Sequence, residues 1–375
     1  MWRYLTMYLL LVPQLLGLLI GGWGWLLGPT TTVAVLVLGE ALLGDDLTPA
    51  TIKPSRLADG LLYLALPLML LLMLVTLWAL TPGDMLGLGA WLAGVIDYPF
   101  VAAKQQTPWW LIPAALQGSG LMLASLGTIV GHELCHRAGQ PLAQVVSRWL
   151  LAFSCDTAFA IEHVYGHHRW LGSDNDPATA PRGRNVYQHI WRSSWFGNLS
   201  AWRIEAKRLA LRRLPRLSWH NRYLRGQAMS LTLLALAYLL ANWQGALVFV
   251  ACALIAKAYL EIVNYMEHYG LVRDPCKPVQ PRHSWNSNNR ISGWATFNLT
   301  RHSHHHAKAQ LPFEQLQPLV QTPMMPAGYM TTILLTLIPP LWRRVMAPRL
   351  AQWDREFASD QERQLLQQKG WLSQP

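Results

Sequence analysis

The sequence contains long stretches without charge, and these constrain the fold more than any other feature. Residues 7–27, 61–80 and 111–131 are apolar, and each is about 20 residues long, the length of an α-helix that crosses a hydrocarbon core of about 30 Å. Charged residues make up 14% of the chain, whereas ordinary soluble domains carry roughly 25%. The sequence therefore predicts a membrane protein with several transmembrane helices.

A longer apolar run covers residues 228–263 and has to be assigned to one span or to two. One span needs about 20 residues, and Asn242 and Gly245 favour a turn inside the run. With two spans, His268 returns to the side of the membrane on which His132 and His163 lie. We therefore predict a helical hairpin in this run.

The predicted fold is an all-α, polytopic membrane protein that forms a single domain over residues 1–375. The predicted spans are 7–27, 31–44, 61–80, 111–131, 228–242 and 245–264. The polar regions 132–226 and 265–326 are predicted to carry the catalytic residues.

Two C-terminal segments have a different character. Residues 327–342 are apolar but too short and too interrupted by prolines for a span, so we expect an interfacial or re-entrant segment. Residues 350–375 are predicted to form a soluble helical tail, in which Ser359 and Glu362 have the spacing of a capping box.

The net charge of +11 is concentrated in one polar segment. Residues 181–226 contain eleven Arg or Lys against one acidic residue, Glu205. A nucleic-acid-binding patch would also be basic, but basic residues that flank transmembrane helices stay in the cytoplasm. We therefore predict that this segment is cytoplasmic, and we expect no nucleic-acid partner.

The four cysteines limit the kinds of redox module in the chain. They are Cys135, Cys155, Cys252 and Cys276, and no two of them form a C-x-x-C pair. This spacing excludes a zinc ribbon and a cysteine-ligated iron–sulfur or rubredoxin-type module.

Most of the 13 histidines fall in four short segments, which read HELCH, EHVYGHH, NYMEHYGL and RHSHHH. The nine candidate metal ligands are His132, His136, His163, His167, His168, His268, His302, His305 and His306. On a helix, residues three and four positions apart share a face. We therefore expect the histidines within a segment to point together, except for His304, which we expect to point away.

The number of clustered histidines indicates more than one metal ion. Imidazole binds iron, zinc, copper and nickel, and nine imidazoles exceed the ligands that one metal accepts. The spacing therefore predicts two metal ions. The other histidines, His189, His220, His283 and His304, are interpreted as structural.

Two other kinds of metal protein have to be weighed. Residues His132 to His136 satisfy H-E-x-x-H, the signature of zinc proteases, in which Glu133 would be the general base. Such a site needs one further ligand and leaves the other clustered histidines without a role. A metal transporter would hold its ligands in the middle of the membrane, whereas these histidines lie at or beyond the predicted span ends.

The sequence resembles the integral-membrane alkane hydroxylases, within the wider membrane fatty-acid desaturase and hydroxylase superfamily. The four histidine segments match the histidine boxes of that family in order and spacing, and RHSWNS and IPPLWRRVM also resemble alkane hydroxylase segments. The tail AQWDREFASDQERQLLQQKGW resembles instead the hydroxylase subunit of xylene monooxygenase. The chain departs from the family pattern at Cys135, Arg137 and His304, of which the last stands where Asp is usual.

The resemblance implies two non-haem iron ions, held by the nine histidines, and O2 as co-substrate. It implies hydroxylation of a terminal methyl group of a medium- or long-chain alkane, with an aromatic methyl group or desaturation of a fatty acyl chain as alternatives. Electrons would come from a partner, either rubredoxin or a ferredoxin or flavin/iron–sulfur reductase, because the chain has no redox cofactor motif of its own. The implied location is a bacterial-type inner membrane, with the active site on the cytoplasmic side.

Several polar residues are candidates to orient these ligands, because metal-ligating histidines usually donate their second N–H to a nearby acceptor. The carboxylates that adjoin predicted ligands are Glu133, Glu162 and Glu267. Glu261 and Asn264 lie at the membrane end of the last span, where a carboxylate is costly and often functional. Asp174 and Asp176 are weaker candidates. The periodicity of the spans does not identify the substrate, because it cannot rank which side chains line the pocket.

Overall fold

The computed structural model describes residues 1–50 and 56–372, and within them the chain is helical. The described residues form no β-strand, only the isolated bridges Asp45–Asn289 and Asn286–Met324. The contacts divide the chain into two compact units, and the single domain that we predicted over residues 1–375 stays a prediction. Unit 1 comprises Met1–Val35, Arg56–Thr157 and Leu224–Tyr259, and unit 2 comprises Leu36–Ser55, Ala158–Tyr223 and Leu260–Pro375.

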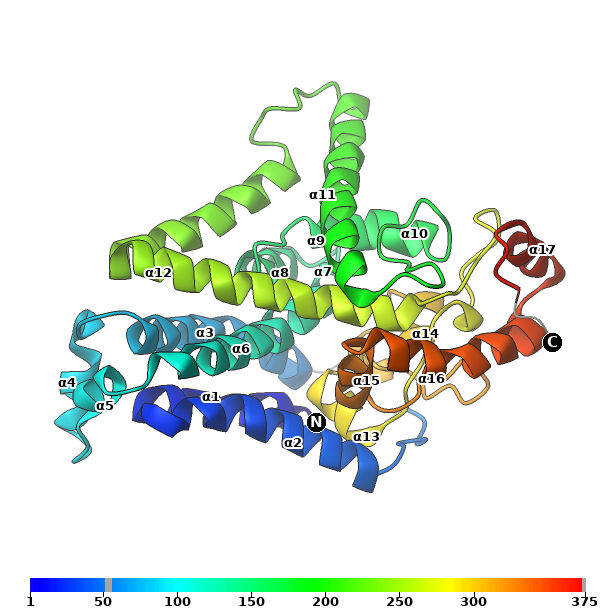
Figure 1. Cartoon of the computed structure of the whole chain (residues 1–375). Helices are drawn as coiled ribbons and strands as arrows, with labels where there is room; N and C mark the ends of the chain where they lie inside the picture. Colours follow the sequence, from blue (N-terminus) through cyan, green and yellow to red (C-terminus); the bar gives the residue numbers. More distant parts are fainter. Residues whose placement is uncertain (51–55, 373–375) are drawn as a thin grey trace. The chain divides into compact units, whose positions relative to one another are not determined.

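Five helical segments are long and apolar enough to cross a membrane, as expected for a polytopic membrane protein. They are Trp2–Ile20, Gly22–Leu42, Arg56–Leu80, Trp109–Cys135 and Arg222–His268. In Figure 1 they correspond to α1 (Thr6–Ile20), α2 (Leu27–Leu42), α3 (Arg56–Leu80), α6 (Ile112–Leu123) with α7 (Val130–Cys135), and α12 (Arg222–His268). The chain is therefore an integral membrane protein.

The first predicted span, 7–27, differs from the helix that the structure contains. Helix α1 ends at Ile20, and Gly21 adopts a positive φ of 73°. A Cβ at this position would lie 2.9 Å from the backbone of Ala103, so a side chain does not fit there. The chain then enters a 3-10 helix, Gly22–Leu26, and continues into α2. Apolar composition alone does not reveal this break, because both sides of it are equally apolar.

The long helix α12 reverses direction, as the hairpin prediction requires. Ala241 and Asn242 have non-helical backbone angles, with a positive φ of 52° at Asn242. A Cβ at Gly245 would lie 2.3 Å from the carbonyl oxygen of Ala237, although eight residues of straight helix would separate these positions by about 12 Å. Figure 1 shows the two legs of α12 joined at this bend. The turn predicted near Asn242 is confirmed.

The remaining helices of unit 1 include those that pack against the first histidine segment. The shorter helices of unit 1 are α4 (Leu88–Ala93), α5 (Phe100–Gln105) and α8 (Pro141–Ala152). A π-helical turn, Ala124–Ile129, precedes α7. The hydroxyl of Ser147 on α8 donates to the carbonyl of Gly131 at 2.7 Å, and both residues are buried. This contact holds α8 against α7, the helix that carries His132.

Unit 2 carries the second and fourth histidine segments on short helical elements and the third at the end of α12. These short elements are α9 (Phe159–Glu162), a π-helical turn (His163–His167), α10 (His168–Trp170) and α14 (His302–Ala307). Unit 2 also contains the long helix α11 (Val186–Leu211) and the short helix α13 (Arg290–Ala295). The C-terminal helices are α15 (Tyr329–Thr336), α16 (Pro339–Gln352) and α17 (Asp360–Gln368), with a π-helical turn at Trp353–Phe357. Short 3-10 turns lie at Trp2–Leu5, Met85–Gly87, Trp109–Leu111, Pro281–His283 and Phe313–Gln315.

The C-terminal tail is anchored rather than free within unit 2. The predicted capping box is present, because Ser359 accepts from the backbone of Glu362 and the Glu362 side chain accepts from the backbone of Ser359. Arg182 donates to both carboxylate oxygens of Asp354. The tail was predicted to extend over 350–375, of which 373–375 lie outside the described residues.

Candidate metal centre

Four buried histidines of unit 2 converge on one point. The four-histidine group consists of His167, His268, His302 and His306, whose ligand nitrogens all lie within 4.8 Å of one another. They come from the π-helical turn, the end of α12 and α14. Three segments far apart in the sequence therefore supply one compact set of imidazoles.

The nitrogen distances in this group suit a metal ion. Nε2 of His302 lies 3.1 Å from Nε2 of His268 and 2.9 Å from Nε2 of His306. Four nitrogens arranged tetrahedrally at about 2.1 Å from one ion would lie about 3.4 Å apart. No hydrogen-bond partner is found among the described residues for Nε2 of His167, although this side chain is buried. Buried polar nitrogens normally have a partner, so a metal ligand role accounts for this nitrogen.

The protonation state of His306 fits the same role. Burial, followed by the neighbouring imidazoles of His168 and His302, lowers the pKa of His306 well below its usual value. The ring is therefore neutral, which is the state that binds metals.

Asp176 orients His167 from the opposite side of the ring. Nδ1 of His167 donates to Oδ2 of Asp176 at 2.9 Å, and both side chains are buried. Asp176 is itself fixed by the hydroxyl of Thr179 at 2.6 Å and the backbone N–H of Ala178 at 3.1 Å. Burial opposes charging of His167, but the Asp176 carboxylate outweighs it and raises the pKa of His167. From the sequence we interpreted Asp176 as one of the weaker candidates, whereas in the structure it makes the clearest contact that orients a histidine.

Glu267 contacts His302 at Nε2, the ring nitrogen that also faces His268 and His306. Oε2 of Glu267 lies 3.2 Å from Nε2 of His302, and Oε1 accepts a hydrogen bond of 2.6 Å from the hydroxyl of Tyr329. Tyr329 begins α15 and is buried. Sequence reasoning missed Tyr329, because it lies outside every histidine segment and belongs to no motif.

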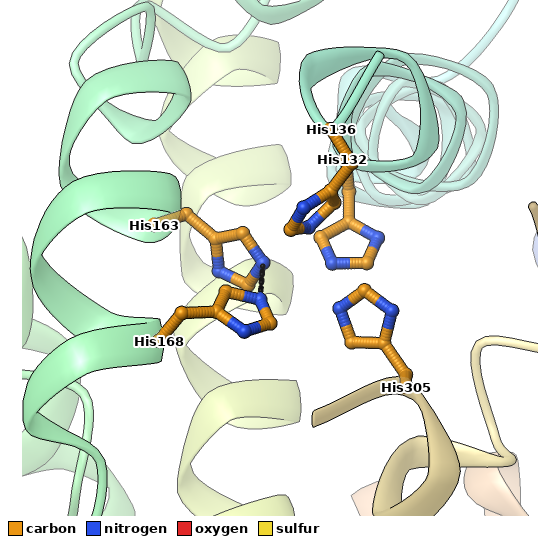
Figure 2. A group of neighbouring side chains, drawn as sticks. All are labelled: His132, His136, His163, His168 and His305. Carbon is orange, nitrogen blue, oxygen red and sulfur yellow. Dashed lines mark hydrogen bonds between the residues drawn. The ribbon is translucent and has the colours of Figure 1, made fainter. Parts of the chain in front are cut away.

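Three further histidines of unit 2 form a second group beside the first. The three-histidine group consists of His163, His168 and His305, whose ligand nitrogens also lie within 4.8 Å of one another. Nε2 of His163 lies 3.0 Å from Nε2 of His168, as the dashed line in Figure 2 marks. The ring of His168 lies 4.4 Å from that of His306, so the two groups are neighbours.

The π-helical turn decides which histidine joins which group. We expected His163 and His167 to share a face, as residues four apart do on an α-helix. In a π-helix the repeat is longer, since each N–H bonds to the carbonyl five residues before it. His163 therefore pairs with His168, and His167 turns toward the four-histidine group. In the same way α14 sends His305 to one group and His302 and His306 to the other.

His304 stands apart, as the spacing predicted. Its Nδ1 accepts a hydrogen bond of 3.0 Å from the backbone N–H of Gln317, and it belongs to neither group. Among the other histidines interpreted as structural, His283 pairs with Glu362 at 2.7 Å. His189 packs against Tyr265, with ring centroids 5.4 Å apart. His220 is exposed.

The first histidine segment lies in unit 1. The rings of His132 and His136, also labelled in Figure 2, have centroids 5.0 Å apart on one side of the helix end. Glu133 accepts a hydrogen bond of 3.1 Å from Arg137, which also donates to Asp59. Glu133 therefore pairs with an arginine, unlike the free general base that a zinc protease needs.

The other polar candidates have partners of their own. Glu162 accepts from Ser200 at 3.3 Å, and burial, with the charge of Asp176 second, raises the pKa of Glu162 to about 8. The amide of Asn264 donates to Glu261 at 3.2 Å. Asp174 is exposed and pairs with Lys369 rather than with a histidine.

Comparison with known proteins agrees with this geometry. The fatty acid desaturase family matches residues 107–335, which include all four histidine segments. The chain is 36% identical to alkane 1-monooxygenase 1 of Pseudomonas aeruginosa over 75% of its own length and 72% of that protein. It is 38% identical to alkane 1-monooxygenase 2 of the same organism over 66% of its length and 65% of that protein. It is 32% identical to the xylene/toluene monooxygenase hydroxylase component of Pseudomonas putida over 97% of its length and 92% of that protein.

Both the extent of the family match and the identity to these relatives exceed what chance or a shared fold would give. The protein belongs to the fatty acid desaturase family and, within it, to the alkane hydroxylase group of membrane-bound, oxygen-dependent monooxygenases.

Proposed function

We propose that this chain is a non-haem di-iron monooxygenase that hydroxylates a terminal methyl group of a medium- or long-chain alkane. The observation that carries the proposal is the division of seven buried or half-buried histidines of unit 2 into two adjacent groups that contain neither cysteine nor carboxylate. Imidazole suits iron among other transition metals. The family relationship, rather than the geometry, favours iron over zinc or copper.

The ligand set that we propose has nine members. Seven are the histidines of the two groups, and His132 and His136 supply the remaining two. The three-histidine group by itself offers fewer nitrogens than the four-histidine group, and the first histidine segment offers two imidazoles on one side of a helix end. When bound, the irons would supply the binding and reduction of O2.

The chain's own residues orient and insulate this centre. Asp176 holds the ring of His167 through Nδ1, which sets the tautomer that leaves Nε2 for the metal. Glu267 contacts His302 at Nε2, the nitrogen that faces the rest of the four-histidine group. The burial of the four-histidine group excludes bulk water from it. The protein would thus hold a hydrophobic methyl group near the centre without competition from solvent.

The electrons come from outside the chain. Hydroxylation consumes O2, two electrons and two protons, and yields the alcohol and one water molecule. We propose rubredoxin as the donor, or a ferredoxin or flavin/iron–sulfur reductase if the chain follows the xylene enzyme. The basic segment 181–226 would attract an acidic donor. It also supports a bacterial inner membrane location with a cytoplasmic centre, because basic flanks remain in the cytoplasm.

An aromatic methyl group is the second candidate substrate. The alignment with the xylene/toluene component covers 97% of this chain, and it includes the tail, whereas the two alkane enzymes compared above cover 75% and 66%. Both substrates present a methyl group on an apolar body. Desaturation of a fatty acyl chain would use the same metal ions and is the third candidate.

Metal content and product together test the proposal. Purified protein should contain about two irons per chain, and membranes supplied with a donor system and ¹⁸O2 should convert n-octane to labelled 1-octanol. His306→Ala should lose iron and activity. Exposed His220→Ala should retain both, and it serves as the matched control. One zinc per chain, unaffected by His306→Ala, would refute the proposal, and labelled alcohol from p-xylene alone would select the aromatic alternative.

A further inference from the structure

A cavity of about 430 Å³ lies in unit 2, and Asp176 is among the residues that line it. Its lining includes Asp176, Arg184, Arg192, Phe196, Ser200 and Arg203. A shallower hollow beside it is lined by Arg184, Gln188, Trp191 and Arg192. Arg184 and Arg192 thus belong to both hollows and connect them.

Three arginines line this cavity, and their charge exceeds that of the Asp176 carboxylate, which is bonded to His167. Over the part of the chain that the structure describes, Arg184, Arg192 and Arg203 form no ion pair with a carboxylate. Burial, followed by the positive charge of Arg192, lowers the pKa of Arg184.

Neighbouring basic residues differ from these three. Lys369, which also lines the cavity, is paired with Asp174, and Arg182 is paired with Asp354. Arg208 and Arg222 share Glu205. The cavity therefore gathers three arginines without a carboxylate partner among the described residues, next to basic residues that have one.

Exposed aromatic side chains flank the arginines. Tyr187, Trp191 and Trp195 are spaced four residues apart along α11 and are 57%, 70% and 62% exposed. The two indoles stack with centroids 6.1 Å apart at 21°, and the guanidinium of Arg192 lies 5.3 Å from the centroid of Phe196. Trp and Tyr are enriched where a membrane meets water, and such stripes next to arginines are typical of helices that contact anionic lipid surfaces.

We propose that this cavity binds the phosphate of an anionic phospholipid headgroup, with the aromatic stripe of α11 in the interfacial layer. The arginines would bind the phosphate, since a guanidinium binds a phosphate through two N–H groups. The exposed indoles favour a lipid over free phosphate, because inorganic phosphate has no apolar portion for them to contact. The inference stands independently of the metal chemistry.

Native mass spectrometry of the purified full-length chain in detergent tests the proposal. Phosphatidylglycerol should bind more tightly than phosphatidylcholine. Near an anionic lipid surface each basic residue contributes a factor of about five in affinity, so Arg192→Gln with Arg203→Gln should weaken phosphatidylglycerol binding by about 25-fold. Lys207→Gln with Arg212→Gln removes the same charge outside the cavity, from α11 and from the residue that follows its end, and should leave phosphatidylglycerol binding nearly unchanged.

Two further variants keep the result interpretable. Arg192→Lys with Arg203→Lys keeps the charge and should restore part of the binding. Trp191→Ala with Trp195→Ala changes only exposed side chains, and it should weaken lipid binding while the melting temperature is retained.

Three outcomes would overturn the proposal. If phosphatidylglycerol binding falls equally in the cavity variant and in the control variant, the lipid responds to the overall positive charge and not to this cavity. Binding of inorganic phosphate alone as tightly as phosphatidylglycerol would make this a site for a free anion. If the binding of an acidic donor protein depends on Arg192 and Arg203 and the binding of phosphatidylglycerol does not, the cavity is a protein-docking surface.

Discussion

Asp176 accepts a hydrogen bond of 2.9 Å from Nδ1 of His167, and both side chains are buried. This contact determines which ring nitrogen of His167 faces the rest of the four-histidine group. It is the arrangement found around metal-ligating histidines, in which a carboxylate fixes the tautomer and ring orientation.

Replacing this carboxylate should therefore weaken metal binding without removing a ligand. We expect Asp176→Asn to lower metal affinity by about 10- to 100-fold, the usual cost of losing such a partner. Competition with a chelator, read out as metal per chain, measures the effect. Asp174→Asn is the matched control, because Asp174 is exposed and pairs with Lys369 rather than with a histidine. Equal metal retention in both variants would mean that Asp176 does not orient a ligand.

Tyr329 should act on the centre through Glu267 rather than by touching it. Tyr329→Phe removes the hydroxyl that donates to Glu267 at 2.6 Å and leaves a buried carboxylate oxygen without this donor. We expect a loss of stability of about 1–3 kcal/mol and a changed spectroscopic signature of the bound metal. Tyr187→Phe controls for loss of a hydroxyl, because Tyr187 is exposed and donates to the carbonyl of Leu337. Unaltered metal spectra in Tyr329→Phe would leave Tyr329 with a structural role only.

These contacts show how far the sequence could be interpreted alone. Apolar runs and the i, i+4 spacing predicted the membrane helices, the hairpin and the isolation of His304, because these features depend on local periodicity. The assignment of His163 and His167 to different groups was not predictable, because the π-helical turn leaves no mark in composition. Tyr329 was missed for a different reason, since it meets Glu267 only after the chain between them has folded.

The hairpin in α12 gives a prediction about folding. A Cβ at Gly245 would lie 2.3 Å from the carbonyl oxygen of Ala237, so Gly245→Ala forces the two legs of α12 apart. We expect a loss of about 1–3 kcal/mol, as for overpacking in a core, measured as a lower melting temperature in detergent. Gly60→Ala in α3 is the control, because a Cβ there has open space and alanine favours a helix. A Gly245→Ala protein as stable as Gly60→Ala would contradict the reversal at this site.

Glu205 connects α11 to the start of α12 and should make stability depend on pH. Its carboxylate accepts from Arg208 at 2.6 Å and from the backbone N–H of Arg222 at 2.7 Å. Burial disfavours the charged carboxylate, but the hydrogen bonds from Arg208 and Arg222 outweigh it and lower the pKa of Glu205 to about 2. The folded protein therefore favours the ionised form, and this stabilisation is present above the ordinary pKa of 4.5 and is lost as the pH falls toward 2.

Glu205→Gln should remove this stabilisation selectively. At pH 7 we expect the variant to be less stable by about 1.5–3 kcal/mol, the usual contribution of hydrogen bonds to charged groups. Below pH 4.5 the glutamate of the unfolded chain becomes protonated while the folded protein keeps its carboxylate charged until the pH nears 2, so the difference between the two proteins should shrink. Melting temperatures of both proteins between pH 7 and pH 3 measure this. A difference that stays constant over the whole range would show that the glutamate acts through packing and not through its charge.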